Sequence, residues 1–574
     1  MQYINTLDLE TYTGSLDFTY AWSVAFRLYN KNYIIADTKD ESNNLDLTRN
    51  IIKALDLIKN ICKSKVVTFY IHNLKFDKEF FLYYLLANYE DVTGQGLRNF
   101  SLKDNQFMYV ASNLGQWYTL TFNYKGLTIE FIDSYKLLPF SLDKLAKDFK
   151  VKHTKLTMNY DNNYLTSENK DYILNDIIAL SEVIQKFRSV ANTSKNTIAS
   201  SAYDIFIRML ESENKDSESL FPRLSSDIDL FCRKAYKGGF CYVNEKYQGK
   251  TINKKGKVFD VNSLYPFVMS SDRLMPVGDP VFNKKKKGQY VDIYKISCKA
   301  KCKYYPFIFN KSFSNKSSYM KVIDTDTLKD LCLYVTDADL QLIKDFYDIE
   351  YLHIIETVTF RAVKASYLFK NYIDKYAKMK IDHAKEKDAP YHIAKLLQNS
   401  LYGKFGSSYE LEIYKFNNDL VLTAIDGSKK ECKQSYVCLA AFITAYARDY
   451  IIRNIMKHPN EFLYCDTDSI HTLDIKDIDL DIDSSRYGAF KLEYEFTQAK
   501  YIRQKCYIEK IDEKNYYTGI CGLSKDKQKD IQEKLVNKEL KLNDISIGFT
   551  CKGKRQLKKV KGGYIITDTD FTIK

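Results

Sequence analysis

The chain has 574 residues, several times what one hydrophobic core requires, so about three to five structural units are expected. Its 86 Lys and Arg residues against 73 Asp and Glu residues give a net charge of +13. This charge suits a polyanionic partner and equally an ordinary basic protein. The twelve cysteines are dispersed without zinc-ligand spacing, which favours reduced thiols and excludes a disulfide-stapled secreted domain.

The composition also bears on membranes and nucleic acids. The N-terminus lacks the basic and apolar regions of a secretory signal, and the longest apolar run, from Tyr436 to Ala447, is too short to span a bilayer. A soluble protein that does not bind membranes is therefore expected. The 47 tyrosines could stack on bases or simply fill core and surface.

The N-terminal third alternates strand and helix patterns. Strands are expected at Tyr3–Leu9, Val66–Ile71 and Leu127–Ile132, with helical spacing such as Phe80–Leu86 between them. This order predicts an α/β unit.

The rest of the chain divides less regularly. Residues 284–287 and 310–318 are polar and predict exposed loops of an inserted region. Helical spacing from Phe369 to Phe405, interrupted by a charged turn at 385–390, predicts a helical hairpin. The alternating stretch from Gly563 to Phe571 predicts a small terminal β unit.

A first set of carboxylates lies in the N-terminal third. Asp8 and Glu10 share one face of the end of the first strand, since side chains alternate with a period of two. Asp77 follows the second strand in the segment HNLKFD, and Asp176 ends YILND within a helical pattern. Phosphodiester hydrolysis uses two Mg²⁺ ions roughly 4 Å apart, held by oxygen ligands. These four acids are therefore predicted to form a nuclease centre.

Other residues near these motifs could assist the chemistry. Tyr172 lies one helical turn before Asp176, where its hydroxyl could orient the attacking water. Residues that could hold an unpaired 3′ end by hydrogen bonding and stacking are His72, Asn73, Phe76, Ser134 and Phe140. Taken alone, each of them is better explained by a structural role.

A second set of carboxylates lies further along the chain. Asp260 begins the segment DVNSLYP at the end of a short strand, and Asp466 and Asp468 occupy the turn of a predicted hairpin in YCDTDS. Nucleotidyl transfer also uses two Mg²⁺ ions, with Asp260 and Asp468 as bridging ligands and Asp466 in support. A surface turn rich in Asp is the alternative for the hairpin acids taken alone.

A third motif provides a nucleotide pocket. Helical spacing places Lys395, Asn399 and Tyr402 on one face, where the lysine would neutralise triphosphate oxygens. Tyr265 and Tyr402 would flank the nascent base pair. Lys380 is a second phosphate candidate, although a solvated lysine face explains it equally well.

Two further segments are candidates for DNA contacts. Arg503, Lys505 and Tyr507 are predicted to alternate along one strand and to face primer phosphates, with an exposed β face as the alternative. The segment YKGG places Tyr236, Gly238 and Gly239 between the two modules, where paired glycines let the backbone approach a DNA strand.

The ordered set of motifs resembles family B DNA polymerases over nearly the whole chain. The YxGG segment and the 135 residues between Asp260 and Lys395 (395 − 260) resemble the protein-primed branch of small Bacillus-type phages. The resemblance implies a mixed α+β multidomain fold, in which an RNase H-like α/β exonuclease domain precedes a right-hand polymerase with two insertions. The implied domains are exonuclease 1–198, palm 199–270 and 432–520, first insertion 271–367, fingers 368–406, second insertion 407–431 and thumb 521–574.

The resemblance also implies site residues and partners. Lys155 matches a lysine that assists exonuclease cleavage, Asp339 matches a contact to a priming protein, Val261 joins the metal and nucleotide sets, and Ser263 joins the nucleotide set. Implied cofactors are two Mg²⁺ ions per active site, for which Mn²⁺ can substitute. Implied partners are template and primer DNA, deoxynucleoside triphosphates and a terminal protein bound as a heterodimer to an otherwise monomeric enzyme. The second insertion would give processive strand displacement, in the cytoplasm of an infected bacterium.

Two other hypotheses remain open at this point. A nucleic-acid-primed repair or replication polymerase would carry the same catalytic motifs and would form no protein–nucleotide adduct. A catalytically inactive DNA-binding homologue would have lost a metal carboxylate, and the sequence retains all of them.

Overall fold

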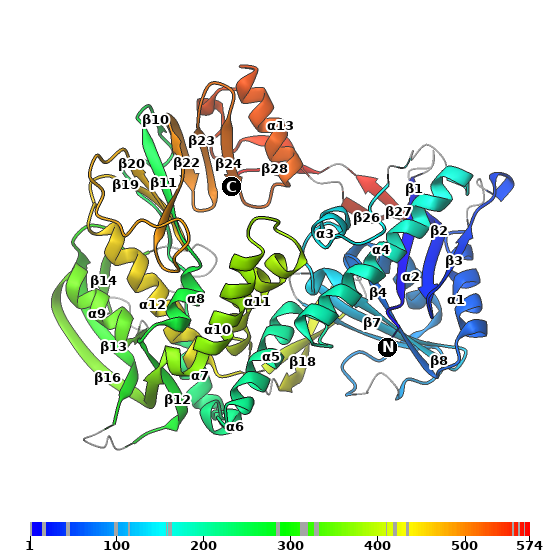
Figure 1. Cartoon of the computed structure of the whole chain (residues 1–574), viewed down its shortest axis with the longest axis horizontal. Coiled ribbons are helices and arrows are strands. Elements are labelled where there is room, and N and C mark those ends of the chain that lie inside the picture. The colour runs from blue at the N-terminus through cyan, green and yellow to red at the C-terminus, as the bar shows by residue number, and fades with distance from the viewer. Residues whose placement is uncertain are drawn as a thin grey trace.

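The computed structural model describes residues 3–574 except 14–18, 42–45, 97–100, 113–114, 157, 159–162, 283–287, 310–318, 326–331, 409, 417–421, 432–434, 554–555, 561–562 and 568. The predicted loops at 284–287 and 310–318 therefore lie outside the described residues. The chain forms an N-terminal α/β unit and a larger set of units around a second, central sheet (Figure 1).

The N-terminal unit is built on a ten-stranded sheet with strand order β26-β27-β2-β1-β4-β8-β7-β6-β5 and with β3 paired to β2. Strand β4 has the predicted bounds, whereas the strand expected at Tyr3–Leu9 is β1, which runs from Thr6 to Thr13. The strands from this part of the chain are β1 Thr6–Thr13, β2 Thr19–Leu28, β3 Lys31–Ala36, β4 Val66–Ile71, β5 Glu90–Asp91, β6 Gln106–Ala111, β7 Trp117–Tyr124 and β8 Leu127–Asp133. Its helices are α1 Arg49–Ile61, α2 Leu74–Asn88, α3 Leu142–Asp148 and α4 Ser167–Ala191.

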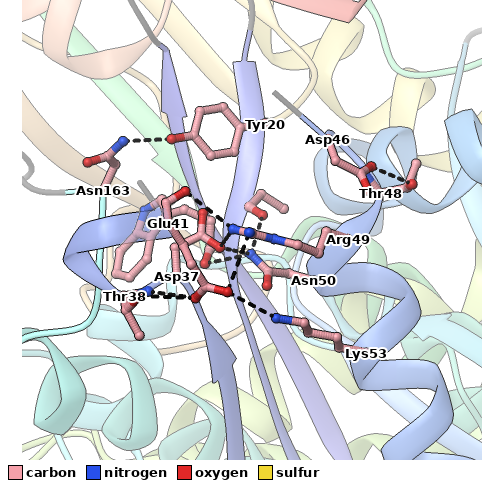
Figure 2. A network of polar contacts seen from close by, with 12 residues as sticks. Tyr20, Asp37, Thr38, Glu41, Asp46, Thr48, Arg49, Asn50, Lys53 and Asn163 are labelled. Carbon is pink, nitrogen blue, oxygen red and sulfur yellow. Dashed lines mark hydrogen bonds and ion pairs between the residues drawn. The ribbon is translucent and has the colours of Figure 1, made fainter. Parts of the chain in front are cut away.

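Helix α1 is held on this sheet by apolar packing and by a polar network at its N-terminal end (Figure 2). Its buried side chains recur with helical spacing, as at Ile51, Leu55 and Ile58. The buried Asp37 carboxylate pairs with Arg49 and accepts a hydrogen bond from Nδ2 of Asn50 at 2.8 Å. Because buried charges need partners, this network fixes the end of β3 against the helix.

The central sheet has the order β21-β11-β20-β19-β9 and carries the second set of acids. The predicted hairpin is confirmed, with β19 and β20 joined by Thr467 and Asp468. Its strands are β9 Cys241–Val243, β11 Gly256–Val261, β19 Phe462–Asp466, β20 Ser469–Leu473 and β21 Phe490–Phe496. Nearby helices are α5 Ile198–Ser212, α6 Ser217–Leu220, α7 Ser226–Ala235, α8 Leu264–Ser270 and the almost wholly buried α12 Val437–Ile455.

The predicted first insertion forms its own antiparallel sheet, β12-β16-β13-β14 with β15 on β13. Its elements are β12 Leu274–Pro280, β13 Tyr290–Cys302, β14 Val322–Asp324, β15 Leu333–Thr336, α9 Asp337–Phe346 and β16 Tyr347–Lys364. The predicted helical hairpin follows as α10 Ala365–Asp382 and α11 Ala389–Phe405. The predicted second insertion is a hairpin of β17 Glu410–Phe416 and β18 Leu422–Glu431.

The C-terminal unit combines a four-stranded sheet, order β10-β22-β23-β24, with helix α13 and a short β25–β28 pair. Its core joins Ile502 and Ile508 to Ile531, so it crosses the predicted thumb boundary at 520/521. The β26–β27 hairpin leaves this unit and extends the N-terminal sheet, where Thr19 pairs with Tyr564 (Figure 1). The elements are β10 Thr251–Ile252, β22 Gln498–Arg503, β23 Cys506–Lys510, β24 Tyr516–Ile520, α13 Lys525–Val536, β25 Thr550–Lys552, β26 Gln556–Val560, β27 Gly563–Thr567 and β28 Asp570–Thr572.

Candidate active sites

The four predicted nuclease acids converge from three elements. In β1, Asp8 and Glu10 share the half-exposed face, while the alternate residues Leu7 and Leu9 point into the core. Asp77 lies in the first turn of α2, and Asp176 lies in α4. Helices packed on the sheet thus bring distant acids over one strand.

The charges of these acids influence one another. Burial, and after it the charge of Asp176, raises the pKa of Asp8 to about 7. Burial raises the pKa of Glu10 to about 9, with Asp8 as the next cause. Burial and then Asp8 also raise the pKa of Asp77. Carboxylates that repel one another in a partly desolvated site are stabilised when a cation binds to them.

Lys155 and Tyr172 both lie beside Asp176, as predicted for assisting residues. The Lys155 ammonium nitrogen is 3.4 Å from Oδ2 of Asp176 and 5.4 Å from the centre of the Tyr172 ring. Among the described residues, no group makes a hydrogen bond to the buried Oδ1 of Asp176. An orphaned carboxylate oxygen among repelling acids fits a bound divalent cation.

The side-chain positions do not form a closed metal site. Among the described residues, no three His, Cys, Asp or Glu side chains lie close enough together to hold a metal ion. The donors are hard oxygens, which suit Mg²⁺ or Mn²⁺, and the carboxylates would have to draw in to coordinate such an ion.

The residues predicted to hold an unpaired 3′ end divide into two kinds. Ser134 is buried, and its hydroxyl lies 3.0 Å from Nδ1 of His72, whose Nε2 donates to the backbone oxygen of Phe140 at 2.8 Å. Burial lowers the pKa of His72 to about 4, so its ring is neutral. The side chains of Asn73 and Phe76 are more open. His72 and Ser134 therefore have a supporting role in the site, and Asn73 and Phe76 remain candidates for direct contact with an unpaired 3′ end.

Two residues of this region were missed in the sequence. Tyr135 is 39% exposed and packs its ring against His72 at 5.6 Å, which offers a further stacking surface. Asp133 is buried and accepts backbone hydrogen bonds from Asn73 and Tyr135. The sequence could have indicated Tyr135, because it is an aromatic residue next to Ser134. The contacts of Asp133 depend on the fold and could not be predicted from the sequence.

The second site is a cavity of about 450 Å³ between the central sheet and the helical hairpin. The rings of Tyr265 and Tyr402 stack there with centres 4.2 Å apart. On α11 the polar face enters the cavity, while Ile393, Leu397 and Leu401 pack into the core on the other side. The predicted residues that line the cavity are Asp260, Val261, Ser263, Tyr265, Lys380, Lys395, Asn399, Tyr402 and Asp468.

The acids of this cavity are electrostatically linked. Burial raises the pKa of Asp260 to about 7, with Asp468 as the next cause, and burial raises the pKa of Asp468 to about 6. Lys395 opposes both shifts. The backbone of Val261 donates to the backbone oxygen of Asp468 at 2.8 Å, which ties the two acid-bearing strands together. The side chain of Val261 is fully buried and apolar, so only its backbone could bind a metal or nucleotide.

Asp466 is oriented differently from the other two acids. Its Oδ1 accepts a hydrogen bond from Nζ of Lys505 at 2.7 Å, and its Oδ2 accepts one from the Tyr464 hydroxyl at 3.3 Å. In this arrangement Asp466 holds the lysine that was predicted to grip primer phosphates.

Lys380 and several unpredicted residues complete the cavity wall. Nζ of Lys380 donates to the Ser263 hydroxyl at 3.0 Å, and burial and then Lys395 lower the pKa of Lys380. Tyr391, Gln398 and Lys491 also line the cavity. Tyr391 lies one helical turn before Lys395, so helical spacing could have found it.

The prediction that Arg503, Lys505 and Tyr507 alternate along one strand is wrong. Arg503 ends β22, Tyr507 lies in β23, and Lys505 occupies the turn between them with φ 57°. Tyr507 is 9% exposed and belongs to an aromatic core. A tight hairpin divides the three side chains, which an alternating pattern alone does not reveal.

The glycine segment, residues 236–239, packs between the end of α11 and the turn that joins β19 to β20. A Cβ on Gly406, at the end of α11, would lie 2.6 Å from the Tyr236 ring. A Cβ on Gly239 would lie 2.7 Å from Thr467, whereas Gly238 has open space. Gly239 is thus required for contact with the catalytic turn, and Gly238 is the glycine open to an approaching strand.

Asp339 does not lie on the surface as a partner contact requires. Its side chain is 5% exposed and pairs with Arg448, whose Nη2 is 2.8 Å from Oδ1. The prediction of a direct contact between this carboxylate and a priming protein is contradicted, because α9 turns Asp339 inward.

Residues 58–164 and 161–487 match the family model of DNA polymerase type B, organellar and viral. The chain belongs to this family of type B DNA polymerases. Among the described residues, no helix is long and apolar enough to cross a membrane.

Phage polymerases are similar over most of the chain. The DNA polymerase of Bacillus phage phi29 is 33% identical over 540 residues, covering 88% of this chain and 90% of that protein. The DNA polymerase of Streptococcus phage Cp-1 is 30% identical over 554 residues, covering 91% and 90%. An orthorhombic crystal form of phi29 DNA polymerase matches with a TM-score of 0.82 at 28% identity over 100% of both chains. The predicted multidomain fold class is thereby confirmed.

Proposed function

We propose that the chain is a DNA-directed DNA polymerase with a separate 3′→5′ exonuclease, and that it replicates a linear phage genome from a protein primer in the cytoplasm of an infected bacterium. The observation that carries the polymerase activity is the cavity where two acids, three lysines and a tyrosine stack meet. The complex of phi29 DNA polymerase with primer-template DNA and incoming nucleotide matches with a TM-score of 0.81 at 27% identity over 100% of both chains, which supports these substrates.

In the polymerase cavity each group has a part in nucleotide addition. Lys395 and Lys380 would neutralise the triphosphate, and Tyr402 stacked on Tyr265 would support the new base pair. Asp260 and Asp468 would hold two Mg²⁺ ions, which lower the pKa of a primer hydroxyl and stabilise the leaving pyrophosphate.

In the exonuclease site the chain's residues would position water and the scissile phosphate. Asp8, Glu10, Asp77 and Asp176 supply the oxygen donors for a pair of Mg²⁺ ions. The Tyr172 hydroxyl, beside Asp176, would orient the water, and Lys155 would stabilise the phosphate charge. An unpaired 3′ end would reach this site across Asn73 and Phe76.

The second insertion supports strand displacement through its contact with the N-terminal unit. The backbone of Phe416 donates to the Tyr109 hydroxyl at 2.8 Å, and its ring lies 5.4 Å from that of Tyr109 and 6.1 Å from that of Trp117. Nζ of Lys415 donates to the backbone oxygen of Asp91 at 2.7 Å. A hairpin anchored across two units would enclose the template and exclude the displaced strand.

The decisive experiment is extension of a primed single-stranded circle with Mg²⁺ and deoxynucleotides alone. Products many times longer than the circle are expected, because the chain would displace its own product. No incorporation would refute the polymerase proposal, and products that stop at one circle length would refute strand displacement.

Priming requires a separate test, since a nucleic-acid-primed polymerase shares the same cavity. The purified chain would be incubated with a candidate terminal protein from the same genome and one labelled deoxynucleotide. A covalent protein–nucleotide adduct is expected. Its absence with every such protein, while DNA primers are extended, would favour nucleic-acid priming.

A further inference from the structure

A buried ion pair links the first insertion to the core of the polymerase unit. Asp339 in α9 and Arg448 in α12 are each 5% exposed, and Nη2 of Arg448 lies 2.8 and 3.0 Å from the two carboxylate oxygens. Thr336 caps α9 and donates its hydroxyl to Asp339 at 3.1 Å. Burial alone would raise the pKa of Asp339, but Arg448, Lys237 and the Thr336 hydroxyl together hold it below its ordinary value.

The other nitrogen of Arg448 reaches the glycine segment. Its Nη1 donates to the backbone oxygens of Lys237 and Gly238, both at 2.9 Å. A planar guanidinium can serve a carboxylate and two carbonyl groups at once, which a lysine cannot do. The ion pair therefore ends on the backbone that immediately precedes Gly239 and Phe240.

That backbone in turn contacts the catalytic turn. The backbone nitrogen of Thr467 donates to the backbone oxygen of Phe240 at 2.7 Å, and Gly239 packs directly on the Thr467 side chain. Thr467 has φ 67°, which a β-branched residue adopts only when its surroundings hold it there. It stands between Asp466 and Asp468, so its position sets the position of both acids.

We propose that Arg448, held by Asp339, is a positioning residue of the polymerase centre: it clamps residues 237–240 against Thr467 and so sets the spacing of the catalytic carboxylates. This inference rests on the proposed polymerase function. It gives Asp339 a role in every nucleotide addition, including addition to an ordinary DNA primer. A contact to a priming protein would instead affect initiation alone.

The same two helices provide a matched control. Nη2 of Arg453 bonds Asp345 of α9 at 2.7 Å, and its Nε bonds Asp449 of α12 at 2.6 Å. This second ion pair also joins α9 to α12, but it ends on the helices themselves. Asp345→Asn therefore tests the effect of loosening the helix pair without touching the glycine segment.

The test compares the wild type, Asp339→Asn, Arg448→Lys and Asp345→Asn on a DNA primer-template without any priming protein. For each enzyme, kcat and KM for the deoxynucleotide and the Mg²⁺ concentration for half-maximal rate are measured. Single-stranded exonuclease activity, from a distant site of the same chain, reports that the chain is folded. Because a misplacement of 1 Å can cost about 10²-fold, kcat is expected to fall at least about tenfold in Asp339→Asn and Arg448→Lys.

The expected pattern separates positioning from general weakening. The KM for nucleotide should change less than about twofold, since the lysines and tyrosines of the fingers are untouched, and more Mg²⁺ should be needed. Asp345→Asn should match the wild type. Wild-type kcat in a folded Asp339→Asn or Arg448→Lys enzyme would overturn the inference, as would an equal loss of exonuclease activity. If Asp339→Asn does not fold, the inference is tested by Arg448→Lys alone, because this variant keeps the buried charge pair. A wild type that fails to extend the primer would instead refute the proposed function itself.

Discussion

Replacing Tyr265 by Val should relax discrimination against ribonucleotides. Its ring stacks on Tyr402 at 4.2 Å and lines the nucleotide cavity, so it cannot swing aside without losing an aromatic contact worth about 0.5–1.5 kcal/mol. A 2′-hydroxyl forced against a fixed ring adds an overpacking cost of about 1–3 kcal/mol. At about 1.4 kcal/mol per factor of ten, Tyr265→Val should lose roughly 5- to 150-fold of its selectivity.

The assay is single-nucleotide incorporation opposite one template base, with kcat/KM measured for the deoxynucleotide and for its ribonucleotide. Tyr265→Phe is the control, because it keeps the ring and removes only the hydroxyl, and it should discriminate as the wild type does. If Tyr265→Val retained the wild-type ratio, the ring would not be the barrier and the steric reasoning would be wrong.

The remaining predictions address the two sites and the second insertion. Asp468→Ala should lower incorporation by about 10³-fold or more while sparing degradation of single-stranded DNA, and the double variant Asp8→Ala with Asp77→Ala should do the reverse. Loss of both activities in either folded variant would contradict two independent sites. The pKa of Asp260 is raised to about 7, and carboxylates bind cations only when deprotonated. Lowering the pH from about 8 to about 6 should therefore raise the Mg²⁺ concentration for half-maximal extension by about tenfold, as measured by Mg²⁺ titration at each pH. Phe416→Ala should weaken docking of the β17–β18 hairpin by roughly 1–3 kcal/mol and shorten products on the primed circle without reducing single-nucleotide addition.

The positions of the candidate residues within each element could be predicted because they depend on local patterns. A period of two put Asp8 and Glu10 on one face of β1. Helical spacing put Lys395, Asn399 and Tyr402 on the face of α11 that lines the cavity. These relations follow from backbone geometry within a single element, and they hold wherever the element is placed.

Local sequence patterns could not predict which residue each side chain contacts in a different part of the fold. Lys505 sits in a hairpin turn and bonds Asp466, although alternation suggested a strand that faces DNA. Lys380 reaches Ser263 from another unit, 117 positions along the chain. Local spacing carries no information about such contacts, because they depend on how separate elements pack.

Asp339 shows the difference most clearly. The resemblance assigned it to a contact with a priming protein, yet capping of α9 and packing against α12 bury it beside Arg448, 109 positions away. Residue types and short-range periodicity indicated which groups could perform the chemistry. Long-range packing decided which of them meet a substrate and which hold the others in place, since a buried charge must find its partner from whatever element the fold brings near.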